Sequence, residues 1–214
     1  MNDTLKTRQD LGHQLEMGFA PNDWTEADVQ KLKEGTLLAQ VLHLVRGTGV
    51  IQIIKHIINL AGDCMPKAWK DQGSWSIRPE DQIKGVKNTG TLEIVDLVRQ
   101  VVFHLSPNQK DGKVIEGHKL RKELEKNKVP VLNACVLDHL LLHPELIPED
   151  WKKDENGNTR FIYFWGTVYR NANGDLYVRY LFWNDGVWDW YCSYLDRGWP
   201  DQRPSVILAS VPQP

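Results

Sequence analysis

Two segments decide the fold of this chain, Phe161-Ile-Tyr-Phe-Trp-Gly-Thr-Val-Tyr169 and Leu176-Tyr-Val-Arg-Tyr-Leu-Phe-Trp183. Both are rich in aromatic and β-branched residues, which favour strands. Between them lies Arg170-Asn-Ala-Asn-Gly-Asp175, in which the Asn-Gly pair tolerates the positive φ angles of a hairpin turn. The sequence therefore predicts an antiparallel hairpin, followed by a second turn at Asn184-Asp185-Gly186 and a final strand over residues 205–210.

Upstream of this hairpin, the apolar residues recur mainly at helical spacing. We expect helices within residues 5–47, near 114–126 and over 133–142, the last with Asn133 as its N-cap. Residues 50–60 are rich in β-branched residues and favour a strand, although a helix is not excluded. A helical N-terminal half followed by an antiparallel β C-terminal part defines the α+β class.

Two intermediate stretches are less decisive. Glycines, prolines and many polar residues predict irregular structure over 61–90, and the apolar spacing over 92–105 fits either a strand or a helix. The chain then divides into two regions. Residues 1–110 form a helical or mixed region with one or more strands, and residues 111–214 contain helices that lead into the β part.

The composition is that of an ordinary globular protein. Of 214 residues, 41% are hydrophobic and 25% are charged, which excludes wholesale disorder. The formal net charge of −2 does not indicate a basic surface for binding nucleic acid. Only a short basic face at Lys119, Arg121 and Lys122 favours a nucleic-acid adaptor. The N-terminus has no apolar signal-peptide core, and no apolar run approaches the roughly 20 residues of a membrane span. We therefore expect a cytoplasmic protein, with export by another route left open.

No catalytic motif stands out. The chain lacks a P-loop, a G-x-G-x-x-G loop and a G-x-S-x-G nucleophile elbow. His139 and His143 have the i, i+4 spacing that can bind a metal, but position 140 is leucine rather than the glutamate of the zinc-protease motif. Solvent-facing or capping roles are therefore favoured for both. We expect no enzyme, no cofactor and no metal site.

The cysteines show no pattern of a disulfide framework or a zinc site. They are few and widely spaced: Cys64, Cys135 and Cys192. Three free thiols are expected, with Cys135 inside a helix core.

Tryptophan is the residue type with a skewed distribution. Five of the nine tryptophans fall in the last fifty residues: Trp165, Trp183, Trp188, Trp190 and Trp199. Four of them lie within residues 183–204, among side chains that follow neither a strand period nor a helix period. This segment fits a long, tryptophan-anchored loop or a recognition surface about equally well, because Trp, Tyr and Arg supply most interface energy.

Four sequence elements characterise the tail: Phe-Trp-Gly-Thr at 164–167, Asp-Leu-Tyr-Val-Arg-Tyr-Leu at 175–181, Trp-Asn-Asp-Gly at 183–186 and Pro-x-x-x-Leu-Ala-Ser at 204–210. With them, the tail resembles the variable region of proteins diversified by retroelements (diversity-generating retroelements), of a small bacterial type. The resemblance is clearest over residues 160–210 and extends more weakly over 113–151. It implies a C-type-lectin-like fold for the tail, used in many members without calcium.

In such systems, error-prone reverse transcription replaces template adenines, so that an Asn codon AAC becomes any NNC codon. The resemblance thus implies a variable, ligand-binding surface made of Asn184, Asp185, Asp189, Tyr191, Cys192, Ser193, Tyr194, Arg197, Gly198, Pro200, Asp201, Gln202 and Arg203. Tryptophan has the adenine-free codon TGG, which implies a constant scaffold of Trp183, Trp188, Trp190 and Trp199. Gln202 departs from the pattern, because no NNC codon encodes glutamine.

The favoured function is therefore a ligand-binding module whose C-terminal surface captures a protein or cell-surface partner of varying identity, and not nucleic acid. The alternative is a carbohydrate-binding module in which exposed Trp and Tyr stack on sugars. Exposed, coplanar rings at Trp188, Trp190 and Trp199 would favour that alternative. Neither the ligand nor the oligomeric state follows from the sequence.

Overall fold

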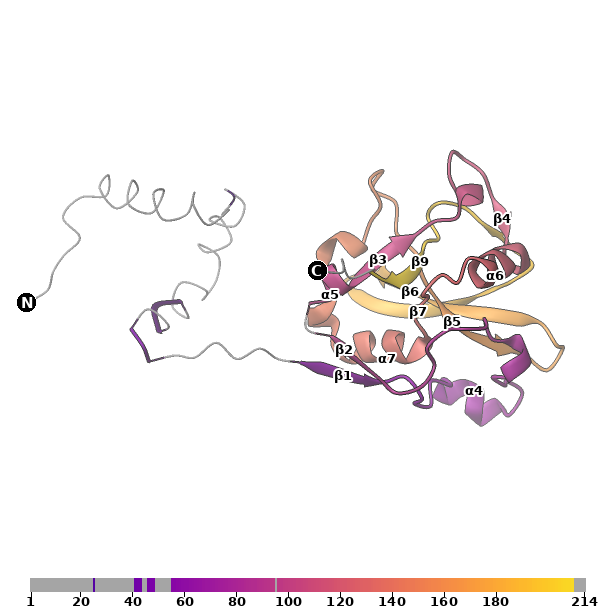
Figure 1. Ribbon diagram of the computed structural model, residues 1–214, viewed down its shortest axis with the longest axis horizontal. Coiled ribbons are helices and arrows are strands. Elements are labelled where there is room, and N and C mark those ends of the chain that lie inside the picture. Colours follow the sequence, from indigo (N-terminus) through magenta and orange to yellow (C-terminus); the bar gives the residue numbers. More distant parts are fainter. Residues whose placement is uncertain (1–24, 26–40, 44–45, 49–54, 95, 210–214) are drawn as a thin grey trace, which may run out of the picture. The chain divides into compact units, whose positions relative to one another are not determined.

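The computed structural model describes residue 25 and residues 41–43, 46–48, 55–94 and 96–209 (Figure 1). The chain forms two compact units, Met1–Ile53 and Ile54–Pro214. In the first unit, residues 41–43 are helical, as expected. Residues 46–48 form a turn, and apart from residue 25, which is not helical, the rest of the helices expected within residues 5–47 lies outside the described residues.

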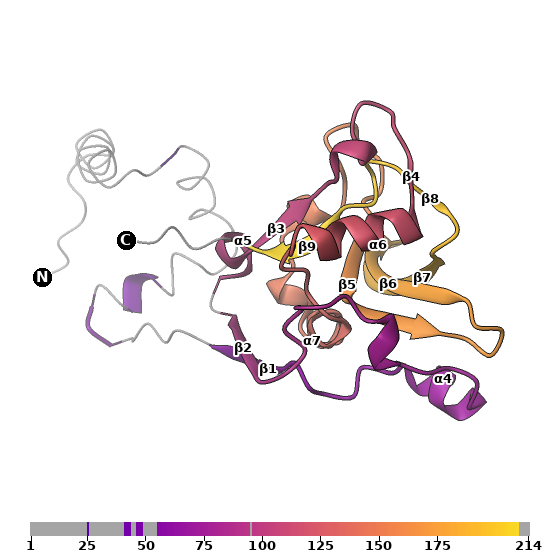
Figure 2. The ribbon, with the colours of Figure 1, turned by 45° about the vertical axis from the view of Figure 1, so that its right-hand side comes forward.

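A five-stranded mixed sheet is the main element of the second unit (Figure 2). Its strand order is β3-β9-β5-β6-β7, with the bounds Val101–His104 (β3), Ser205–Leu208 (β9), Ile162–Arg170 (β5), Leu176–Asn184 (β6) and Val187–Tyr194 (β7). The predicted hairpin of β5 and β6 is confirmed, and its turn contains Gly174 at a φ of 91°. The predicted turn before β7 is confirmed as well, with Asp185 and Gly186 at φ angles of 44° and 93°.

The expected fold class, α+β with a helical N-terminal half and a C-type-lectin-like antiparallel β part, is wrong. The described residues form mostly a β domain with a few short helices. Strand β3, far upstream of the tail, joins the sheet by pairing with β9, and β9 runs parallel to β5 at Tyr163 and Ser205. The apolar spacing over residues 92–105 is compatible with either a helix or a strand. Pairing with β9 makes its last part, Val101–His104, a strand.

Two small antiparallel pairs and several short helices complete the unit. The pairs are β1 (His56–Asn59) with β2 (Thr91–Ile94), and β4 (Ile115–Glu116) with β8 (Gly198–Trp199). The α-helices are α4 (Lys67–Gln72), α5 (Leu97–Gln100), α6 (Gly117–Lys126) and α7 (Ala134–Leu142). Single 3₁₀ turns occur at Pro79–Asp81, Pro107–Gln109, Pro144–Leu146 and Glu149–Trp151.

The expected strand over residues 50–60 is present as β1, although residues 50–54 lie outside the described residues. Helices α6 and α7 confirm the predictions near 114–126 and over 133–142. Asn133 is the N-cap of α7, since its side chain accepts a hydrogen bond from the Cys135 backbone amide at 3.2 Å.

The two faces of the sheet carry separate apolar cores. Neighbouring residues on β5 point to opposite sides, so that Phe164 packs with α7 and β9 while Trp165 packs with α6. In Figure 1, α6 lies above the sheet and α7 lies below it. Both cores contain fully buried leucine side chains: Leu137 and Leu140 on α7 in one core, and Leu120 on α6 in the other.

The Phe-Trp-Gly-Thr element ties β5 to the start of α7. The pairing of β5 with β6 shifts register between Tyr163 and Val168, and the Gly166 amide there donates to the Leu132 carbonyl at 2.9 Å. A β-carbon at position 166 would lie 2.7 Å from the Asn133 backbone nitrogen. Thr167 then accepts from the first amide of α7 at 3.1 Å. Glycine is required at position 166 because the backbone of β5 there approaches the backbone of Leu132 and Asn133 too closely for a β-carbon.

Gly166→Ala should therefore destabilise the protein by about 3 kcal/mol, because the clash involves backbone that cannot rotate away. Gly85→Ala is the matched control: position 85 has φ 82° but open space around it, and should cost only about 1 kcal/mol of backbone strain. Urea unfolding of both variants measures the difference. Equal losses would contradict the close approach at Gly166.

Candidate functional site

Strand β7 occupies the first part of the segment that was expected to be irregular. That expectation is wrong for Val187–Tyr194, which pairs with β6 along its whole length and forms the edge of the sheet. Trp188 and Trp190 are two residues apart and therefore share one face of the strand. The alternation was missed because the aromatic Tyr191 stands at an outward position, between the inward Trp190 and Cys192, and interrupts the pattern of apolar and polar residues.

The tryptophan face of β7 packs inward. Trp190 lies edge-on against Trp69 at 5.5 Å between ring centroids, and the Arg179 guanidinium sits 4.0 Å above its ring. Trp183 and Trp188 contact each other at 5.4 Å with an interplanar angle of 69°. Trp183, Trp188 and Trp190 are half-buried. Because Trp183 and Trp188 are nearly perpendicular, they do not form the coplanar platform that stacks on a sugar ring.

Trp199 lies on β8 and is fully buried. Its ring contacts Tyr163 at 4.2 Å and Trp165 at 4.7 Å between centroids. Gly117 lets this ring approach, because a β-carbon there would lie 2.4 Å from the indole nitrogen of Trp199. A buried ring cannot stack on a ligand, which counts against the carbohydrate-binding alternative at this position.

Arg179 connects the tryptophan face to the rest of the unit. Its side chain is 2% exposed and bonds the Asp138 carboxylate on α7 at 2.7 Å. It also donates to the Cys64 carbonyl at 3.2 Å. Burial lowers the pKa of Arg179, but Tyr169 and Asp138 outweigh this and raise it above the ordinary value. The guanidinium therefore stays charged inside the protein.

The opposite face of β7 is open. Directly opposed residues of an antiparallel pair share a face, and Tyr191 opposes Tyr180 while Asp189 opposes Phe182. Phe161 joins them, with its ring 5.5 Å from that of Tyr180. We call the side chains of Phe161, Tyr180, Phe182, Asp189 and Tyr191 the open face. Tyr191 is 63% exposed, and the three other aromatic rings are half-buried.

The loop after β8 borders the open face. The Phe161 amide donates to the Gln202 carbonyl at 3.1 Å, which fixes the loop beside β5. Arg203 donates to the Gly198 carbonyl at 3.1 Å. Burial raises the pKa of Tyr180, and the positive charge of Arg203 opposes that rise, so Arg203 lies within electrostatic reach of the open face.

A cavity of about 340 Å³ is lined in part by residues of the same loop. Its walls include Asp154, Arg160, Asp201, Gln202 and Phe103, and the Arg160 guanidinium covers the Phe103 ring at 4.7 Å. A ligand that contacts the loop would therefore find a recess with charges of both signs.

Most of the residues expected to vary are at the surface. Those exposed are Asn184, Asp185, Asp189, Tyr191, Arg197, Gly198, Asp201 and Gln202. Those half-buried are Cys192, Tyr194, Pro200 and Arg203. Asp189, Tyr191, Gln202 and Arg203 are brought together at or beside the open face, whereas Asn184 and Asp185 lie at the tip of the β6–β7 hairpin.

Three of the expected residues are unavailable to a ligand. Ser193 lies on the same face of β7 as Tyr191, but it is buried and hydrogen-bonds the Tyr163 hydroxyl at 2.7 Å. Cys192 opposes Arg179 on the tryptophan face, and burial raises its pKa to about 11. Tyr194 hydrogen-bonds Asp196, which raises the tyrosine pKa to about 12. These side chains are committed to contacts within the protein.

Sequence reasoning missed the aromatic floor of the open face, Phe161, Tyr180 and Phe182. The signal was present, because Tyr180 and Phe182 alternate with Arg179 and Leu181 along β6. Finding their partners also required the register between β6 and β7, which the two-residue turn at Asp185 sets.

Three histidines, on β1 and at the end of α7, form a cluster apart from the open face. His56, His139 and His143 each place a ring nitrogen within 4.8 Å of the other two. His143 is the C-cap residue of α7, as expected for a capping histidine, whereas His139 is half-buried and faces His56. The three cysteines are unpaired, and Cys135 is buried in α7.

The chain matches no protein-family model, no curated protein and no solved structure. Across the residues that the structure describes, no helix has the length and apolar character needed to cross a bilayer.

The two kinds of residue in the tail should respond differently to truncation. Trp199→Ala should lower the free energy of unfolding by about 3–5 kcal/mol, because a fully buried ring is lost. Tyr191→Ala should change it by no more than about 0.5 kcal/mol, because the side chain is exposed. Denaturant unfolding monitored by circular dichroism measures both. A larger loss for Tyr191→Ala than for Trp199→Ala would contradict this assignment.

Proposed function

We propose that this protein is a non-enzymatic binding module that uses the open face and the adjoining loop at 200–203 to capture a protein ligand, and that a retroelement diversifies this surface. The observation that carries the proposal is the two-sidedness of β7. Trp188 and Trp190 pack inward, while Asp189 and Tyr191 project from the same strand without contributing to a core.

The backbone supports such a surface independently of its side chains. Strand β7 is held to β6 by a continuous antiparallel pairing that extends from Asn184 and Val187 to Tyr177 and Tyr194. Main-chain hydrogen bonds of this kind are available to every residue except proline. Exposed positions on β7 can therefore accept many side chains without loss of the strand.

The chemistry of the open face favours a protein over a sugar. It combines half-buried aromatic rings with Asp189 and lies beside Arg203, and interfaces concentrate Tyr, Trp and Arg at their energetic centres. Sugar binding would favour parallel, exposed rings, whereas Trp183 and Trp188 are inclined at 69° to each other and Trp199 is buried.

The gene itself provides a direct test of diversification. Codons that descend from AAC keep their final C, so the codons for Asp189, Tyr191, Arg197 and Arg203 should all end in C. The flanking DNA should carry a reverse transcriptase gene and a near-repeat of the tail, with adenines at the differing positions. A locus without a near-repeat, or differences that fall on the Trp188 and Trp190 codons, would refute the retroelement.

A display experiment tests binding separately. Codons for Asp189, Tyr191, Asp201 and Gln202 are randomised, and the displayed library is selected against a panel of unrelated folded proteins. We expect folded, specific binders, because these side chains are exposed.

The matched control library randomises Trp188 and Trp190 together with Leu181, which packs in the same core. This control should yield few folded clones. A result in which the open-face library folds but gives no binder to any target would contradict a binding role for this surface.

A further inference from the structure

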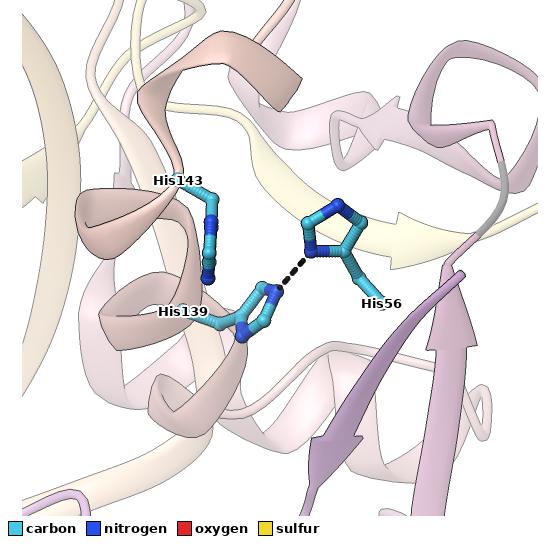
Figure 3. Close-up of side chains that lie close together, drawn as sticks. All are labelled: His56, His139 and His143. Carbon is cyan, nitrogen blue, oxygen red and sulfur yellow. Dashed lines mark hydrogen bonds between the residues drawn. The ribbon is translucent and has the colours of Figure 1, made fainter. Parts of the chain in front are cut away.

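Three histidines converge between β1 and α7 (Figure 3). His56 comes from β1, and His139 and His143 come from the last turn and the C-cap of α7. The Nδ1 atom of His56 lies 3.2 Å from the Nε2 atom of His139. The ring centroids of His56 and His143 are 4.8 Å apart, and those of His139 and His143 are 4.5 Å apart.

The fold holds these side chains together for reasons that do not involve a ligand. Residues four apart on a helix share a face, which aligns His139 with His143. Strand β1 is packed on that helix through a common core that includes Ile58 and Leu140. His56 is thereby held opposite the two helical histidines, and all three rings remain half-buried rather than sealed from solvent.

We propose that His56, His139 and His143 form a binding site for a divalent transition-metal ion of the zinc type, with the fourth position open to solvent. Ligand nitrogens about 2.0–2.1 Å from a tetrahedral ion lie roughly 3.4 Å from one another. The separation of 3.2 Å between His56 and His139 already suits this geometry. The widest separation, up to 4.8 Å, must shorten by about 1.4 Å, which side-chain rotation can provide.

A carboxylate orients one of the proposed ligands. The Nδ1 atom of His143 lies 3.1 Å from Oε1 of Glu145. Donation of the Nδ1 proton to this carboxylate leaves the Nε2 lone pair free for a metal, which is the usual arrangement of a metal-binding histidine and its outer partner. The contact gives His143 the kind of outer partner that metal-binding histidines have.

The donor set selects the class of ion. Three imidazole nitrogens suit Zn²⁺ and its first-row neighbours, whereas Ca²⁺ and Mg²⁺ require oxygen ligands. Bound metal would clip β1 to the C-terminal end of α7 and so stabilise the β1–β2 pair. This role is independent of the open face, which contains none of the three histidines.

The test uses the full 214-residue chain, stripped of metal with a chelator and titrated with Zn²⁺ by calorimetry. We expect one ion per chain. His139→Gln and His143→Gln should each weaken binding by at least about 100-fold, and Glu145→Gln by about 10-fold, as for other outer partners of metal ligands. His118→Gln is the matched control, because this histidine lies on α6 and bonds Asp196 instead.

Circular dichroism of each metal-free variant establishes that it is folded. Should His139→Gln fail to fold, Glu145→Gln decides the matter, since its side chain is exposed: a 10-fold loss supports the site, and unchanged affinity overturns it. The proposal is also overturned if the wild-type chain binds no stoichiometric Zn²⁺, or if His118→Gln weakens binding as much as His139→Gln does. In those cases the histidines form only a hydrogen-bonded cluster.

Discussion

The buried guanidinium of Arg179 is the interaction on which the arrangement of the tail depends. It bonds Asp138 on α7 and donates to the carbonyl of Cys64 before α4. It also lies against the face of the Trp190 ring on β7. A charge held at 2% exposure is tolerated only with such partners. Arg179 thereby links strands β6 and β7, which pair along their length, to α7 and to the segment before α4.

This constraint explains why the two faces of β7 differ. The face toward Arg179 is fixed by charge and by ring packing, and Cys192 and Trp190 are drawn into it. The other face has no such requirement, so Asp189 and Tyr191 are free to meet solvent or a partner.

The sequence predicted the parts of the structure that depend on local signals. The Asn-Gly and Asp-Gly turns, the β5–β6 hairpin and Asn133 as the cap of α7 follow from residues close together in the chain. Strand β3 could not be predicted, because Val101–His104 becomes a strand only by pairing with β9. Strand β7 was missed because the aromatic Tyr191 on its open side interrupts the alternation of apolar and polar residues. His56 joins His139 only through tertiary packing, across 83 positions of sequence.

The central claim is that the frame around Arg179 determines stability, whereas the exposed side chains of the open face and of the adjoining loop do not. It is tested most directly by the free energy of unfolding of a quadruple variant, D189N/Y191N/D201N/Q202N, compared with that of Arg179→Met. We predict a change within about 1 kcal/mol for the quadruple variant, whose four positions are all exposed. Arg179→Met, which leaves the partly exposed Asp138 carboxylate without its charged hydrogen-bond partner, should lose about 1.5–3 kcal/mol. The account is contradicted if the quadruple variant loses as much as Arg179→Met.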